Sequence, residues 1–136
     1  MGFEWSQYLV LAKQLSSATD DASLRSAVGR SYYCAFNLAV ECAERNGYRR
    51  AQDNLGGDHE KLWALYARNS ASQECSELAL LGPRMKQRRV RADYRANFDR
   101  LADGVKDAIE DAEKCVNLLS SLPSNMAIDA PRTWSF

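Results

Sequence analysis

The segment that most restricts the fold of this chain is residues 22–45, where apolar and small side chains surround most of a helix. Leu24 and Val28 begin one stripe at helical spacing, and Tyr32 and Phe36 belong to a second stripe beside it. A helix that is apolar on so much of its circumference packs against neighbours on several sides. We therefore expect a helix at the centre of an α-helical bundle.

The rest of the chain also reads as helical, because β-branched residues are scarce and no segment alternates apolar and polar residues. Apolar residues recur at three- and four-residue spacings over 4–16, 59–69 and 98–122. A further helical region starts near Ser72, is interrupted at Gly82–Pro83 and resumes as far as Tyr94. The sequence predicts an all-α fold, an up-and-down bundle of four to five helices.

Length and hydropathy bound the organisation of the chain. Its 136 residues, 46% of them hydrophobic, suit one domain. We expect a single helical domain over 1–122 and an irregular tail over 123–136, where no period is visible. The longest uncharged stretch of the helical part, 31–40, is too short to cross a bilayer, and the first residues lack the basic segment of a secretory signal. These features predict a cytoplasmic protein with no membrane contact.

The charge balance hides a basic segment. The 18 basic and 18 acidic residues give a net charge of zero, which argues against a globally basic nucleic-acid binder. Residues 84–95 nevertheless contain one acid, Asp93, among several bases: Arg84, Lys86, Arg88, Arg89, Arg91 and Arg95. We interpret Arg84, Lys86, Arg88 and Arg91 as candidates for binding phosphate. The alternative is a solvated face that pairs with the acids of the last helix.

Within this basic segment, Arg89 and Asp93 are four residues apart and so can form a structural ion pair along one helix face.

The cysteines and the histidine predict neither a metal site nor a cofactor. Cys34, Cys42, Cys75 and Cys115 form no C-x-x-C pair, and His59 is the one histidine. Structural zinc needs four thiolate or imidazole ligands, usually in closely spaced pairs. Buried free thiols are therefore the expected state.

The candidate site centres on Arg30. Arg30 and Asn37 are seven residues apart and share a face of the central helix, with Tyr33 beside them. An arginine that emerges from a mostly apolar helix needs an anion or a set of acceptors. That partner is either an internal acid (Glu41, Glu44 or Asp93) or a bound phosphate, which the guanidinium fork suits.

The residues around Arg30 resemble a known family. Residues 25–39, RSAVGRSYYCAFNLA, are similar to the hallmark helix of the HEPN family, which comprises small helical domains of prokaryotic toxin–antitoxin and antiphage systems. Gly57-Asp58-His59 and Arg89-Val-Arg-Ala-Asp-Tyr94 resemble further segments of the family, in the same order. The resemblance covers about residues 22–118. It implies an up-and-down helical bundle that usually forms a homodimer.

By the same resemblance, the site would be that of a metal-independent endoribonuclease, in which an arginine and a following histidine act across the dimer. Arg30 matches the arginine, but Asn37 stands where the histidine is expected. An amide can hydrogen-bond RNA yet cannot transfer protons near neutral pH. His59 is an alternative titratable group, placed at a helix start, where the dipole favours a neutral ring.

Two functions follow from these observations. The first is an HEPN-like protein of a defence or toxin–antitoxin module that binds or cleaves RNA, with Arg30 on a phosphate and Asn37 and Tyr33 lining the site. The alternative is a non-catalytic interaction module that binds a partner protein, such as a nucleotidyltransferase or a larger effector.

Overall fold

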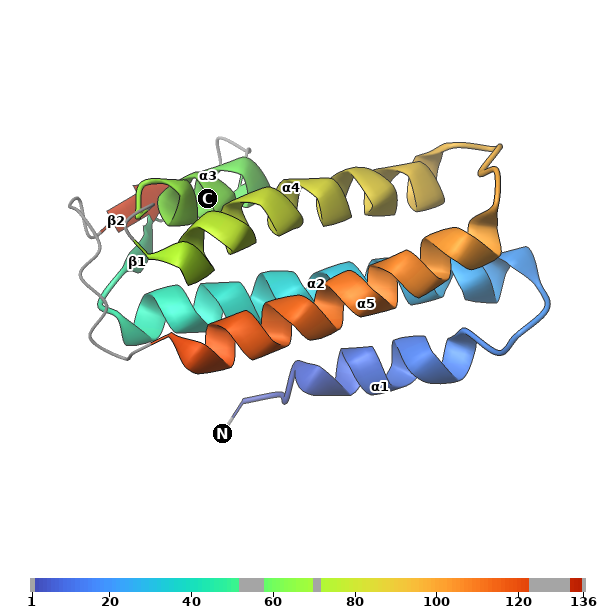
Figure 1. The fold of residues 1–136 in the computed structure, drawn as a ribbon, viewed down its shortest axis with the longest axis horizontal. Coiled ribbons are helices and arrows are strands. Elements are labelled where there is room, and N and C mark those ends of the chain that lie inside the picture. The colour runs from blue at the N-terminus through green and yellow to red at the C-terminus, as the bar shows by residue number, and fades with distance from the viewer. Residues whose placement is uncertain (1, 52–57, 70–71, 123–132, 136) are drawn as a thin grey trace.

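The computed structural model describes residues 2–51, 58–69, 72–122 and 133–135 and shows a bundle of five α-helices within these ranges (Figure 1). The helices are α1 (Ser6–Leu15), α2 (Asp21–Arg45), α3 (Asp58–Ala67), α4 (Gln73–Tyr94) and α5 (Leu101–Ser121). In Figure 1, α1, α2, α4 and α5 alternate in direction, and the short α3 lies beside the first half of α4. The prediction of a helical bundle is confirmed.

Two short strands add to the helices. β1 (Arg49–Ala51) and β2 (Thr133–Ser135) pair in parallel, with Arg50 opposite Trp134. Three residues are too few to show the alternation that identifies a strand in a sequence. Residues 52–57, together with 123–132 and 136 of the expected irregular tail, lie outside the described residues.

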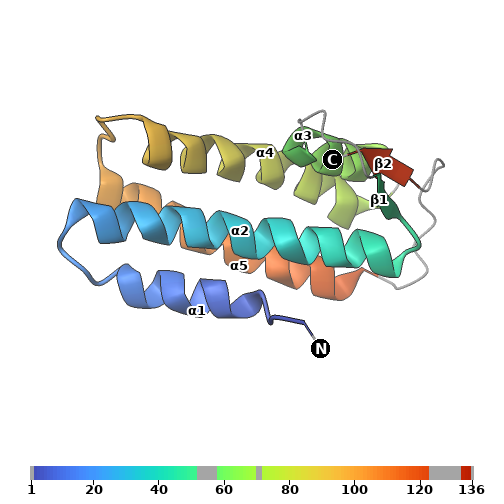
Figure 2. The ribbon, with the colours of Figure 1, turned by 180° about the vertical axis from the view of Figure 1, so that it is seen from behind.

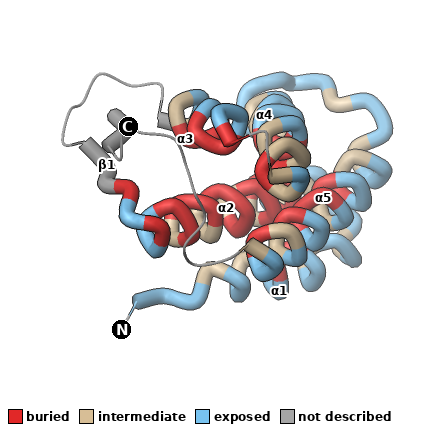
Figure 3. The backbone as a smooth tube through the Cα atoms, turned by 60° about the vertical axis from the view of Figure 1, so that its left-hand side comes forward, coloured by how far each residue is buried: buried red, intermediate tan, exposed pale blue. Residues whose placement is uncertain are grey.

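Helix α2 is the central element, as its sequence predicts. Seen from behind, it lies between α4 and α1, and α5 passes on its other side (Figure 2). Most of α2 is buried, whereas α1, α4 and α5 each expose an outer side (Figure 3). Ala27, Tyr32, Cys34 and Ala35 are completely inaccessible to solvent. Burial of this helix from several directions supplies most of the hydrophobic contact that holds the bundle together.

Side-chain caps and a glycine fix the ends of α2. The Asp20 carboxylate accepts a hydrogen bond from the Ser23 amide at 2.9 Å, which satisfies a free N–H of the first turn. At the other end, Gly47 has a φ of 88°, a left-handed conformation that glycine adopts without steric cost. The long central helix therefore starts and stops where its own sequence directs.

Helix α4 corrects one expectation. The interruption predicted at Gly82–Pro83 is wrong, because α4 is continuous from Gln73 to Tyr94 with Pro83 inside it. The Trp63 ring of α3 occupies the space where a side chain at residue 82 would project, so that a Cβ there would overlap the indole. Packing of α4 against α2, α3 and α5 outweighs the loss of the one helical hydrogen bond that proline cannot make.

Arg25 joins α2 to the end of α4. Its guanidinium donates hydrogen bonds to the carbonyls of Ala92, Arg95 and Ala96, at 2.9, 2.6 and 2.9 Å. These groups lie at the C-terminal end of α4, where carbonyls lack helical partners and a cation is favoured. Arg25 therefore has a structural role that its position in the sequence did not reveal.

No helix within the described ranges has both the length and the apolar character needed to span a membrane.

The Trp63–Gly82 contact can be tested by adding one methyl group. We expect Gly82→Ala to lower the free energy of unfolding by about 1–3 kcal/mol, because the new Cβ overlaps the indole ring. Gly29→Ala is the matched control, since a Cβ there meets no atom within 4 Å and should stabilise α2 by about 0.5–1 kcal/mol. Urea denaturation followed by circular dichroism measures both. Equal effects of the two substitutions would contradict the proposed packing.

Candidate functional site

Arg30 lies on the outward strip of α2 with its guanidinium against aromatic rings. Its central carbon is 4.5 Å from the centre of the Tyr8 ring of α1 and 5.5 Å from the centre of the Tyr33 ring. Among the described residues, Arg30 makes no ion pair with a carboxylate, and Asp93 pairs with Arg89 instead. The half-exposed charge is therefore positioned by aromatic faces and is not neutralised by an acid of the chain.

Asn37 shares this side of α2 but uses its amide group locally. Its Nδ2 donates to the Tyr33 carbonyl four residues earlier, at 2.8 Å. This back-bond to the helix fixes the direction of the amide and leaves Asn37 partly buried next to Tyr33.

Arg89 supplies a second guanidinium from α4. Its central carbon lies 5.5 Å from the Tyr33 ring centre, and its Nη1 donates to Asp93 at 3.1 Å, the i,i+4 pair that the sequence predicts. Burial acts to lower the pKa of Arg89, but Asp93 and Tyr33 outweigh it and raise the pKa above its ordinary value. The Nε is buried and has no hydrogen-bond partner among the described residues.

These side chains form one surface, which we call the Arg30 face: Tyr8, Arg30, Tyr33, Asn37 and Arg89. It extends across α2, from Tyr8 of α1 to Arg89 of α4. Sequence reasoning found Arg30, Tyr33 and Asn37 because they share one helix. It missed Tyr8 and assigned Arg89 only to an ion pair, because packing between helices brings these two residues to Tyr33.

His59 lies beside the Arg30 face, near the start of α3. Its ring stacks on Phe36 with centres 4.2 Å apart and lies 6.0 Å from the Tyr33 ring. Its Nδ1 is 2.6 Å from the Tyr32 hydroxyl, which also accepts a hydrogen bond from the Trp63 indole at 3.2 Å.

The Tyr32 hydroxyl determines what the His59 Nδ1 can do. Burial raises the pKa of Tyr32 far above its ordinary value, so the phenol keeps its proton. The indole N–H of Trp63 can only donate, so it uses a lone pair of the phenol oxygen and leaves the phenol proton for another acceptor. We infer that Tyr32 donates to Nδ1. That nitrogen is therefore an acceptor inside the aromatic cluster and is not directed toward a ligand.

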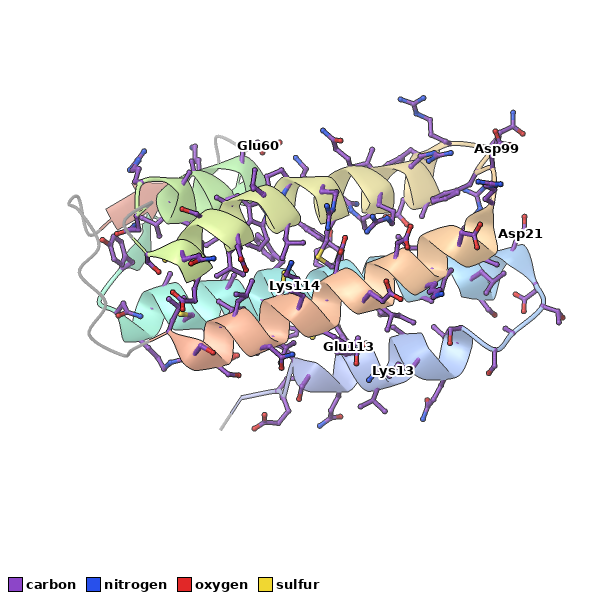
Figure 4. The ribbon with its side chains drawn as sticks, in the orientation of Figure 1. Lys13, Asp21, Glu60, Asp99, Glu113 and Lys114 are labelled. Atoms are coloured by element: carbon purple, nitrogen blue, oxygen red, sulfur yellow. The ribbon has the colours of Figure 1, made fainter. Side chains whose placement is uncertain are left out.

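The basic segment of α4 is divided among different sides of the helix. Arg84 and Arg88 both donate to the nearly buried Asp111 of α5, at distances of 2.8–3.1 Å. Lys86 pairs with Glu60 of α3, which Figure 4 shows on the outer side of α3. Because a helix turns every 3.6 residues, a run of bases cannot present all its charges on one face.

Arg91 lies apart from these pairs, with its guanidinium stacked over the Phe98 ring at 4.3 Å. Of these bases, the structure thus brings Arg89 to Tyr33, whereas it places Arg84, Lys86, Arg88 and Arg91 elsewhere on α4.

The four cysteines are buried free thiols. Burial raises the pKa of Cys34 to about 11 and that of Cys115 to about 12, so neither forms a thiolate near neutral pH. Within the described ranges, no group of three or more histidine, cysteine, aspartate or glutamate side chains has a geometry that would hold a metal ion.

Comparison of the chain with models of protein families, with curated proteins and with solved structures gives no match. The site is therefore interpreted from its own geometry, which offers guanidinium donors and aromatic faces and can bind an anion that carries planar groups.

The hydrogen bond from Tyr32 can be tested by nitrogen NMR on the one histidine of the chain. We expect the neutral ring to carry its proton on Nε2, with Nδ1 showing the shift of an unprotonated acceptor. Tyr32→Phe removes the donor and should change the Nδ1 shift, whereas Tyr94→Phe, on an exposed residue, should not. A proton on Nδ1 in the unmodified chain at alkaline pH would contradict this arrangement.

Proposed function

We propose that the chain is an HEPN-like RNA-binding protein of a prokaryotic defence or toxin–antitoxin module, and that it acts as a homodimer. The observation that supports RNA binding best is the Arg30 guanidinium, which is held between Tyr8 and Tyr33 without a carboxylate partner among the described residues. The proposal also draws on the resemblance of residues 25–39 to the hallmark helix of that family.

Phosphate is the anion that this geometry favours. A guanidinium presents a planar fork of donors that matches two phosphate oxygens, and Arg30 has this fork uncommitted to any acid among the described residues. Arg89 adds a second cation beside Tyr33, although its Nη1 pairs with Asp93. A nucleotide joins a phosphate to a planar base, so cations beside Tyr33 suit both of its parts.

The proposed activity is binding, with cleavage limited by residue 37. Self-cleavage of RNA requires a group that removes the proton of the 2′-hydroxyl, and an amide cannot do this near neutral pH. Asn37 instead hydrogen-bonds the backbone of its own helix, and the His59 Nδ1 is engaged with Tyr32. Arg30 would hold the phosphate in place, but neither Asn37 nor the His59 Nδ1 would be available to accept the proton of the 2′-hydroxyl.

A second candidate function is that of a non-catalytic interaction module. The observation that favours it is the neutralisation of the basic segment, since Arg84 and Arg88 share Asp111 and Lys86 pairs with Glu60. Cations in such pairs contribute less to an electrostatic surface for RNA. In this function the fold would present a surface to a partner protein, such as a nucleotidyltransferase or a larger effector.

RNA binding can be measured by fluorescence anisotropy with a labelled single-stranded RNA of mixed sequence. We expect Arg30→Ala to weaken binding similarly for all sequences and to lower the salt dependence by about one phosphate contact. Lys106→Ala is the charge-matched control, because this lysine is exposed on α5 away from the Arg30 face. Equal losses in the two variants, or no binding by the unmodified chain, would contradict the proposal.

The role of residue 37 can be tested by restoring a titratable ring. We expect Asn37→His to raise metal-independent cleavage of RNA in EDTA by about 10²–10⁴-fold over the unmodified chain, because general acid–base groups contribute on that scale. The double variant Arg30→Ala/Asn37→His should lose this gain, since the phosphate would no longer be held. A single variant that cleaves no faster at any pH would show that the site lacks the geometry of a nuclease.

A further inference from the structure

A groove of about 690 Å³ lies between α3 and α4, away from the Arg30 face. Arg91, one of its lining residues, is two positions from Arg89 and therefore projects from nearly the opposite side of α4. Neither RNA binding at the Arg30 face nor the packing of the bundle uses this groove.

The floor of the groove is apolar and made of short side chains. Ala64 and Ala67 of α3 face Ala79, Pro83 and Val90 of α4. Short residues on two neighbouring helices leave a channel into which the side chains of another helix can fit.

The apolar surface continues beyond the groove. Leu80 is 75% exposed, more than any other large hydrophobic residue of the described chain. It is seven residues from Gln87, which lines the groove, so both lie on the same side of α4. An apolar surface that extends along the helix suits an elongated partner better than a compact small molecule.

The charged residues that line the groove indicate which charge the partner should carry. Glu60 and Lys86, both in the lining, neutralise each other. Arg91 and Arg95 also line it, at the end of α4, and neither pairs with a carboxylate among the described residues. The groove therefore has an apolar floor with two uncompensated positive charges at one end.

We propose that this groove binds an amphipathic α-helix of a partner protein, whose apolar side packs on the alanines and Pro83 and whose acidic residues meet Arg91 and Arg95. RNA is disfavoured there because Trp63, the aromatic side chain of the lining, is 2% exposed and offers no face for a base. The inference gives the second candidate function its surface and rests on that function, not on RNA binding.

The test is a selection from a displayed library of helical peptides of about 16 residues, long enough to form a helix on binding. Apolar positions are fixed at helical spacing, and the remaining positions vary among glutamate, lysine and serine. We expect binders of the full-length chain to be enriched in glutamate. We also expect their affinity to fall about tenfold or more in Arg91→Glu/Arg95→Glu, where like charges would face each other.

Two matched pairs of variants locate the binding. Leu80→Ser should weaken binding of the selected peptides, whereas Val10→Ser, on another exposed apolar residue, in α1, should not. Likewise Lys106→Glu should leave the affinity unchanged, although it alters charge on α5 in the same sense. Circular dichroism of each variant confirms that it is folded.

The proposal is overturned if glutamate is not enriched, or if the selected peptides bind Arg91→Glu/Arg95→Glu as tightly as the unmodified chain. It is also overturned if this double variant loses RNA binding while Arg30→Ala retains it, since the groove would then be a nucleic-acid surface. Failure of Arg30→Ala to affect RNA, with peptide binding intact, would reject only the proposed RNA function.

Discussion

Enclosure of α2 is the constraint on which the rest of the structure depends. Helices α1, α4 and α5 all pack on it, so nearly every turn of α2 places small or apolar side chains in the core. The remaining outward strip is narrow, and a long polar side chain on α2 can leave the core only there. Arg30 follows this route and reaches the surface between Tyr8 of α1 and Tyr33. The position of the candidate site is thus a consequence of how the bundle packs.

Aromatic rings and internal carboxylates hold the cations of this protein in different ways. Arg84 and Arg88 share Asp111, which neutralises much of their charge and joins α4 to α5. Arg30 lies against ring faces and makes no ion pair among the described residues. A bound phosphate gains most from Arg30, because no existing ion pair must be broken to reach its guanidinium.

The helical bundle and the central place of α2 could be predicted from the sequence, because amphipathic spacing and cap residues are local signals. The continuity of α4 could not, since Gly82–Pro83 is a sound local signal for a break. Packing against α2, α3 and α5 maintains the helix, and the Trp63 ring of α3 lies where residue 82 has no side chain. The contact depends on tertiary structure that a local pattern does not contain.

The candidate site was predictable to the extent that it lies on one helix. Arg30, Tyr33 and Asn37 share a face by spacing alone, and that face is where the structure places them. Less could be predicted about the basic segment, because the spacing of its residues does not show which of them pair with acids of other helices. Arg89 reaches Tyr33 whereas Arg91 stacks on Phe98, although both belong to one run of bases. The contacts of each basic residue follow only from the positions of α2, α3 and α5 around α4.

The central claim is that RNA phosphate binds Arg30 on the Arg30 face. The most direct measurement is NMR of the arginine Nε–H groups during titration with single-stranded RNA, assigned by single arginine-to-lysine variants. The account predicts that the Arg30 signal shifts and exchanges more slowly with water, while those of Arg84 and Arg88, which already donate to Asp111, stay unchanged. An unchanged Arg30 signal at saturating RNA would contradict it.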